Sequence, residues 1–212
     1  MHYTVMFTSV SHSCLKRTRC VAALLRTLTI AVQCLLFLLV SGQLSAADSL
    51  TIRTNYYDVT GDTLQGIREE IVRQRPWKEE RDAFTRWKVD WTFTMEDPGS
   101  GCRLKSLNIT TDITITMPRW NVAASEDERL KAAWISYFKL LATHEEGHKQ
   151  IALAAAKEAR KRILQLKPTA SCPELESAIN REGKKVITQF AEREKVYDER
   201  TDHGRKQIDP TR

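Results

Sequence analysis

The sequence predicts an α+β fold in which a largely antiparallel sheet comes first and long helices follow. In residues 50–56 and 87–95 apolar and polar side chains alternate, which is the period of half-buried strands. After Pro118 the apolar residues recur every three or four positions, as on amphipathic helices, and no proline occurs from residue 125 to residue 167. Strands that are followed by a run of helices are typical of the α+β class.

The N-terminal elements follow from local patterns. The first strand is expected to end near the turn at Gly61, and Leu64, Ile67 and Ile71 have the spacing of a helix over residues 63–74. Pro76 ends this helix because a proline has no backbone N–H to continue it.

The next strand has an aromatic buried face that includes Trp87 and Trp91. The turn at residues 97–101 connects it to a segment rich in Leu, Ile and Thr, residues 102–117, so we expect a hairpin or a meander.

Two long helices are expected in the C-terminal half. Capping boxes, in which a serine precedes a glutamate by three residues, predict their starts at Ser125 with Glu128 and at Ser171 with Glu174. The first helical segment ends at Pro168, as one helix or as two that join near Gly147. The second continues to about Val196.

Residues 1–47 have the pattern of a secretory signal peptide. Four basic residues and no acidic ones occur there, the apolar run of residues 27–40 follows Arg26, and Ser45-Ala46-Ala47 is a suitable cleavage site. The run is shorter than the roughly 20 residues that span a membrane, although an uncleaved anchor is the alternative. Residues 48–212 are then one secreted or periplasmic domain, with no stable membrane association after cleavage.

The leader also explains most of the positive charge. The chain has a net charge of +6, but residues 48–212 hold 29 basic and 27 acidic side chains. Basic and acidic residues alternate in runs such as residues 78–81, which is typical of a solvated helix face. We therefore expect no nucleic-acid partner.

Two cysteines remain after the leader, Cys102 and Cys172. An even pair in a chain bound for an oxidising compartment favours a disulfide. A metal-binding or nucleophilic role is the alternative, but neither cysteine has a cysteine or histidine near it in the sequence.

The segment His144-Glu145-Glu146-Gly147-His148 is an H-E-x-x-H motif within a predicted helix. Residues four apart lie on one helix face, so both imidazoles can reach one Zn²⁺, and Glu145 can act as the general base for its bound water. Two surface histidines would be the alternative. Against it, the motif holds two of the three histidines that remain after the leader.

A catalytic zinc site normally has three protein ligands and a water. The longer H-E-x-x-H-x-x-G-x-x-H pattern is absent, because Ile151 and Ala154 occupy its glycine and third histidine positions. His203 is the one other histidine after the leader, so we expect it to be the third ligand. A glutamate such as Glu174 or Glu176, or a merely exposed His203, are the alternatives.

Three residues near His203 could support the site. Asp198 or Asp202 could orient a ligand through a hydrogen bond. Tyr197 could donate a hydrogen bond to an oxyanion, or simply pack.

The mature chain resembles a bacterial family that is catalogued as a domain of unknown function and described as predicted secreted zinc-dependent proteases. The motifs that carry the resemblance are Tyr57-x-Val59-x-Gly61, Thr85-x-Trp87-x-Val89-x-Trp91, Cys102, Pro118-x-Trp120, Trp134-x-x-Tyr137, His144 to His148, Cys172 and Tyr197-Asp198-x-x-Thr201-x-His203-Gly204. The resemblance implies a zincin-like peptidase fold. It also implies that His203 and Gly204 belong to the site and that Cys102 pairs with Cys172.

These observations predict a secreted or periplasmic zinc metallopeptidase that acts on a peptide or protein substrate. An edge strand from the region of residues 87–117 could hold an extended peptide above the metal. A zinc amidase that acts on cell-wall peptides and a non-catalytic exported zinc-binding protein are the alternatives.

Overall fold

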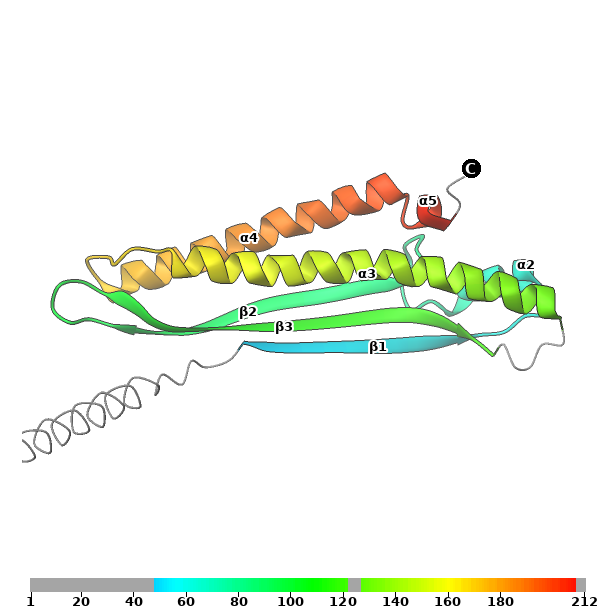
Figure 1. Cartoon of the computed structure of the whole chain (residues 1–212), viewed down its shortest axis with the longest axis horizontal. Helices are drawn as coiled ribbons and strands as arrows, with labels where there is room; N and C mark the ends of the chain where they lie inside the picture. The colour runs from blue at the N-terminus through cyan, green and yellow to red at the C-terminus, as the bar shows by residue number, and fades with distance from the viewer. Residues whose placement is uncertain (1–47, 122–126, 209–212) are drawn as a thin grey trace, which may run out of the picture. The chain divides into compact units, whose positions relative to one another are not determined.

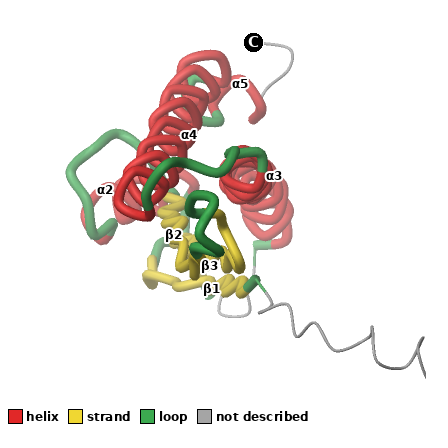
Figure 2. The backbone as a smooth tube through the Cα atoms, turned by 90° about the vertical axis from the view of Figure 1, so that its left-hand side faces the viewer, coloured by secondary structure: helices red, strands yellow, loops and turns green. Residues whose placement is uncertain are grey.

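A computed structural model describes residues 48–121 and 127–208, so the predicted signal peptide lies outside the described residues. Strands β1 (Ser49–Val59), β2 (Phe84–Glu96) and β3 (Arg103–Trp120) form one sheet in the order β1-β3-β2. Helices cover one face of this sheet (Figures 1 and 2). The predicted α+β class is confirmed. Within the described ranges, no helix is long and apolar enough to cross a membrane.

The sheet is mixed rather than largely antiparallel. β2 and β3 form the expected antiparallel hairpin, with Trp91 opposite Ile109, whereas β1 runs parallel to β3, with Ile52 opposite Ile113. A meander would have placed β1 beside β2. The long connection over residues 60–83, which contains α2 (Leu64–Gln74), lets β3 lie between these two strands instead.

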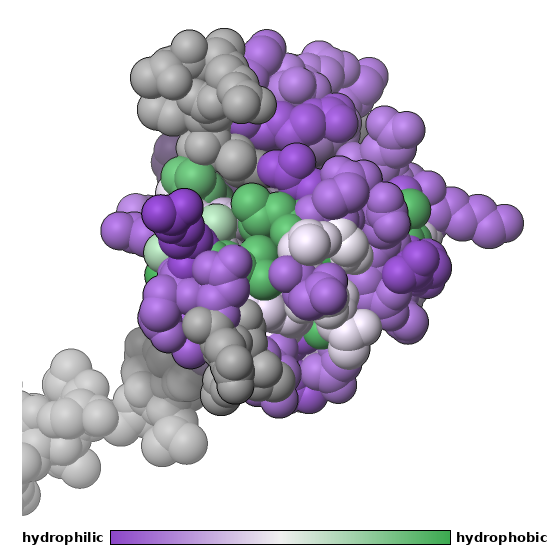
Figure 3. Space-filling model, turned by 90° about the vertical axis from the view of Figure 1, so that its right-hand side faces the viewer, coloured by the Kyte–Doolittle hydropathy of each residue, from purple (hydrophilic) through white to green (hydrophobic). Residues whose placement is uncertain are grey.

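The helix α2 agrees with the prediction for residues 63–74. Thr63 is its N-cap, and the Thr63 hydroxyl accepts a hydrogen bond of 3.0 Å from the backbone N–H of Gly66. The helix buries Ile67 and Ile71 in a cluster with the first turns of α3. Viewed from this end of the molecule, apolar surface gathers between polar side chains (Figure 3).

The helix α3 (Glu128–Leu164) is one uninterrupted helix, and Gly147 does not divide it. Its N-cap is Asp127, whose carboxylate accepts hydrogen bonds from the first turn. The predicted partner of Glu128, Ser125, lies outside the described residues. The helix ends at Leu164, four residues before Pro168, and Gln165 is its C-cap.

The helix α4 (Cys172–Thr201) begins after Ser171, as expected, but the Ser171 side chain makes no capping hydrogen bond. A proline in the first turn, Pro173, has no N–H that would need a cap. The helix continues past Val196 to Thr201, and the short α5 (Arg205–Ile208) follows it.

α3 and α4 lie side by side above the sheet (Figure 1). Small residues make this close packing possible: Ala155 and Ala159 of α3 are fully buried. On α4, a Cβ at Gly183 would overlap the Trp91 ring of β2, and the Trp91 Nε1–H donates a 3.0 Å hydrogen bond to Asn180. These contacts fix α4 to the hairpin.

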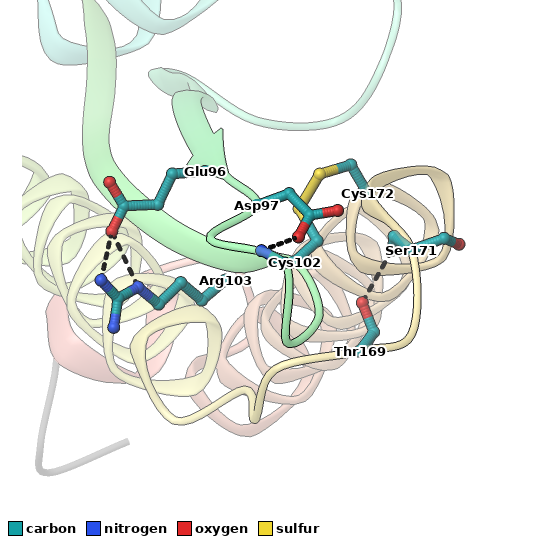
Figure 4. The surroundings of a disulfide bond; sticks show 8 residues. Glu96, Asp97, Cys102, Arg103, Thr169, Ser171 and Cys172 are labelled. Carbon is teal, nitrogen blue, oxygen red and sulfur yellow. Dashed lines mark hydrogen bonds and ion pairs between the residues drawn. A yellow bond between two sulfur atoms is a disulfide. The ribbon is translucent and has the colours of Figure 1, made fainter.

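The disulfide between Cys102 and Cys172 is present and confirms the prediction (Figure 4). It joins the start of β3 to the start of α4, 70 residues later. Beside it, the backbone N–H of Cys102 donates to the Thr169 carbonyl at 2.8 Å, and the Thr169 N–H donates in return at 3.0 Å. The bond and the short bridge together close the end of the hairpin against the helix pair.

We expect reduction of this disulfide to lower the free energy of unfolding by about 4 kcal/mol, because cross-linking a loop of this length restricts the unfolded chain. Urea unfolding of the mature protein with and without a reductant measures the difference. The double variant Cys102→Ala/Cys172→Ala is the control, since its stability should not respond to the reductant. Equal stability of the oxidised and reduced wild type would contradict the prediction.

Candidate metal centre

The H-E-x-x-H motif lies in the middle of α3, facing the last turns of α4. His144 and His148 are 3% and 7% exposed, one turn apart on the same helix face. Asp198 of α4 approaches both of them. Its Oδ1 lies 3.2 Å from His144 Nε2 and 3.0 Å from His148 Nε2, and the two Nε2 atoms are 3.3 Å apart.

These three atoms have the spacing of metal ligands. Zinc binds imidazole nitrogen and carboxylate oxygen at about 2.0–2.2 Å, so neighbouring ligands of a tetrahedral ion are about 3.3 Å apart. Within the described residues, His144, His148 and Asp198 are the group of histidine, cysteine and acidic side chains whose ligand atoms all lie within 4.8 Å of one another. Two imidazoles and a carboxylate can hold a divalent cation.

A second set of contacts orients the two imidazoles. His148 Nδ1 lies 3.2 Å from the Glu194 carboxylate, and His144 Nδ1 lies 3.4 Å from the Thr201 hydroxyl oxygen. The Thr201 hydroxyl donates its own proton to the Tyr197 carbonyl at 2.7 Å, so its oxygen can accept from Nδ1–H. Both histidines then present the Nε2 lone pair to a metal, which is the arrangement that metal-binding histidines usually have.

Glu145 is held beside the two histidines but on the side of the sheet. Its side chain is buried, and the hydroxyl of Thr85 in β2 donates a 2.6 Å hydrogen bond to its Oε2. Burial is the largest influence on the Glu145 carboxyl and raises its pKa, against the smaller lowering effect of the Thr85 hydrogen bond. A carboxylate with a raised pKa is suited to accept a proton and then release it.

Tyr197 packs directly on the motif. Its ring stacks on His144 with 5.0 Å between centroids, and its hydroxyl donates a 3.2 Å hydrogen bond to the His144 carbonyl. A Cβ at Gly147 would overlap this hydroxyl, which explains the glycine inside the motif. The geometry shows Tyr197 in its packing role, while a role toward an oxyanion stays a prediction.

His203 lies at the edge of the same cavity. A turn follows α4, in which Asp202 and His203 both have a φ of 51° and Gly204 has a φ of 84°. A left-handed residue is common at the C-terminus of a helix, as at Asp202, whereas a second one at His203 is less common for a residue other than glycine. A Cβ at Gly204 would lie 3.0 Å from the His144 ring, so only glycine lets the turn pack this closely.

His203 Nδ1 is buried and lies 3.5 Å from Asp198 Oδ2, while the His203 side chain is 38% exposed. The residue is therefore next to the three converging atoms, and its role as a ligand stays a prediction. Asp202 accepts a 3.1 Å hydrogen bond from Arg205 rather than from a histidine. Asp198, which we expected to orient a ligand, itself has the position of one.

The glutamates considered as alternative ligands are excluded. Glu174 and Glu176 are at the opposite end of α4, about 30 Å or more from Asp198 at 1.5 Å per residue. Sequence reasoning missed two residues that contact the site, Thr85 and Glu194, although the sequence pattern indicates a position near the site for each. Thr85 is a polar residue on the same strand face as Trp87 and Val89, and Glu194 precedes Asp198 by one helical turn.

The charges of the site are strongly coupled. Burial alone would lower the pKa of His148, but hydrogen bonds to Asp198 and Glu194 outweigh it and raise the pKa to about 9. Burial alone would raise the pKa of the Asp198 carboxyl, but hydrogen bonds from His144 and His148 hold it well below its usual range. In the metal-free protein the two shifts favour a protonated His148 beside an ionised Asp198.

We expect His148 to titrate near pH 9 in the metal-free protein. Because this pKa exceeds the unfolded value of about 6.5, protonation stabilises the fold fully below pH 6.5, and the contribution is lost as the pH rises through 9. A histidine NMR titration in the presence of a chelator measures it. Glu194→Gln should lower the pKa by removing one carboxylate, and a value near 6.5 in both proteins would contradict the prediction.

Comparisons with known proteins place the chain in a family. No curated protein and no solved structure matches it. A family model matches residues 54–204, which include most of the sheet, the H-E-x-x-H motif, Asp198 and His203. That family is described as a bacterial protein of unknown function, DUF922. The chain belongs to the DUF922 family of bacterial proteins.

Proposed function

We propose that this protein is a secreted or periplasmic zinc-dependent metallopeptidase. The observation that carries the proposal is the convergence of His144 Nε2, His148 Nε2 and Asp198 Oδ1 within 3.3 Å, directly beside the buried carboxylate of Glu145. The disulfide supports an oxidising compartment, since such bonds are rare in the cytosol.

Each residue has a distinct part in this proposal. His144, His148 and Asp198 hold the zinc ion, which when bound acidifies water and polarises a carbonyl group. Glu145 takes a proton from the attacking water and passes it to the leaving amine. Thr85 keeps the Glu145 carboxylate in place through the 2.6 Å hydrogen bond from β2.

The position of β2 supports a peptide substrate. β2 is an edge strand of the sheet, and its first residues are also the ones that contact Glu145. An edge strand has unpaired backbone N–H and C=O groups that an extended peptide can pair with. A peptide added along this edge would bring one of its bonds close to the Glu145 carboxylate.

A second candidate is a zinc-binding protein without turnover, favoured by the buried Nδ1 of His203. If His203 became a fourth protein ligand, the site would be closed, as structural zinc sites are. The effects of removing Asp198 and of removing His203 on zinc binding therefore distinguish the two candidates.

We expect Glu145→Gln to reduce hydrolysis by more than 100-fold while zinc content is unchanged, because the variant loses the proton acceptor and keeps all three ligands. Denatured protein and peptidoglycan peptides are the substrates to assay, and peptidoglycan alone would favour an amidase. Glu146→Gln is the matched control: Glu146 is the next residue, but it is exposed and paired with Lys149. Full activity of Glu145→Gln would exclude the mechanism.

We expect Asp198→Ala to weaken zinc binding by about 100-fold or more, because it removes one of three ligands and leaves two buried imidazoles. His203→Ala should change the affinity by less than 10-fold and leave hydrolysis measurable. Competition with a fluorescent chelator gives both affinities. Equal, large losses in the two variants would instead support the closed site with four protein ligands.

A further inference from the structure

One wall of the metal cavity comes from the residues that lead into β2. Arg81, Asp82 and Phe84 line this cavity together with the two histidines and Asp198. Hydrogen bonds to the Arg81 backbone and to the Asp82 side chain hold this segment in place. The Arg81 carbonyl accepts a 2.7 Å hydrogen bond from Trp77 Nε1, and the Tyr137 hydroxyl donates to the Asp82 carboxylate at 2.9 Å.

The Arg81 side chain has a defined position but no acidic partner among the described residues. Its guanidinium carbon lies 4.8 Å from the centre of the Phe84 ring, a cation–π contact that fixes its direction. Across residues 48–121 and 127–208, no carboxylate lies within ion-pair distance of it. The adjacent Asp82 carboxylate accepts from Tyr137 instead. The guanidinium is half-buried and can therefore donate its hydrogen bonds to a ligand.

The size of the cavity limits what can enter it. Its volume is about 10 Å³, which is room for about one water molecule. A larger substrate group must therefore be recognised at the rim. The partly exposed residues of the lining are Arg81, Asp82, Phe84, Asp198 and His203. With a divalent cation bound, the two charges of the cation and the charge of Arg81 face three carboxylates of the lining, those of Asp82, Glu145 and Asp198.

We propose that Arg81 determines substrate specificity by binding a carboxylate of the substrate next to the metal. This inference rests on the proposed zinc-peptidase function. Guanidinium and carboxylate groups match in geometry and form paired hydrogen bonds, which a lysine cannot reproduce. The carboxylate can be the C-terminus of a peptide or an acidic side chain.

The test uses two small probes that anchor on zinc through a hydroxamate: succinic monohydroxamate, which carries a free carboxylate, and its neutral primary amide. Calorimetry on the zinc-loaded protein should show at least 10-fold tighter binding of the carboxylate probe. Arg81→Met should abolish this preference and leave the affinity for the neutral probe unchanged, and Arg81→Lys should restore only part of it. Arg86→Met is the matched control, because Arg86 lies near the same Phe84 ring, 5.8 Å from its centre, and is not in the cavity lining.

The outcomes are distinct. If neither probe binds, the zinc-peptidase function fails and the inference fails with it. If both probes bind but Arg81→Met keeps the carboxylate preference, only the inference is overturned. Peptides with a free or amidated C-terminus, each with Glu or Gln as the last residue, then identify the carboxylate when they are bound to zinc-loaded Glu145→Gln. Equal binding of all four peptides would also overturn the inference.

Discussion

The structure around the H-E-x-x-H motif depends on three polar atoms that lie close together inside the protein: Nε2 of His144, Nε2 of His148 and Oδ1 of Asp198. Two imidazole nitrogens and a carboxylate oxygen lie 3.0–3.3 Å apart, which is costly unless a positive charge lies among them. Without a metal that charge is a proton, as the raised pKa of His148 indicates. A divalent cation would satisfy all three atoms at once. The helix pair, the strained turn after α4 and the hydroxyl of Thr85 are all arranged around this point.

Several small residues make the arrangement possible. α3 and α4 can approach because Ala155 and Ala159 offer no bulk, and Tyr197 can stack on His144 because position 147 has no side chain. Gly204 then lets the chain turn directly against the His144 side chain. The disulfide at the far end of α4 and the contact of Trp91 with Gly183 hold the rest of that helix, so Asp198 is positioned by a rigid element rather than by a loop.

Periodicity predicted the helices and strands well because each depends on a local pattern, and the motif at residues 144–148 was visible for the same reason. The parallel pairing of β1 with β3 was not predictable, since it depends on where a long connection places β2. The position of Asp198 depends on how α4 packs against α3, and sequence reasoning therefore assigned it only a supporting role. Thr85 joins the site from a strand that is 60 residues away in the chain, a contact that only the tertiary fold creates.

The central claim is a metal centre formed by α3 and the end of α4, and a crystal structure of the zinc-loaded mature protein with anomalous data at the zinc edge tests it most directly. We expect one strong anomalous peak about 2.0–2.2 Å from His144 Nε2, His148 Nε2 and an Asp198 oxygen. The absence of a peak between these residues, or zinc bound only at the surface, would contradict the account.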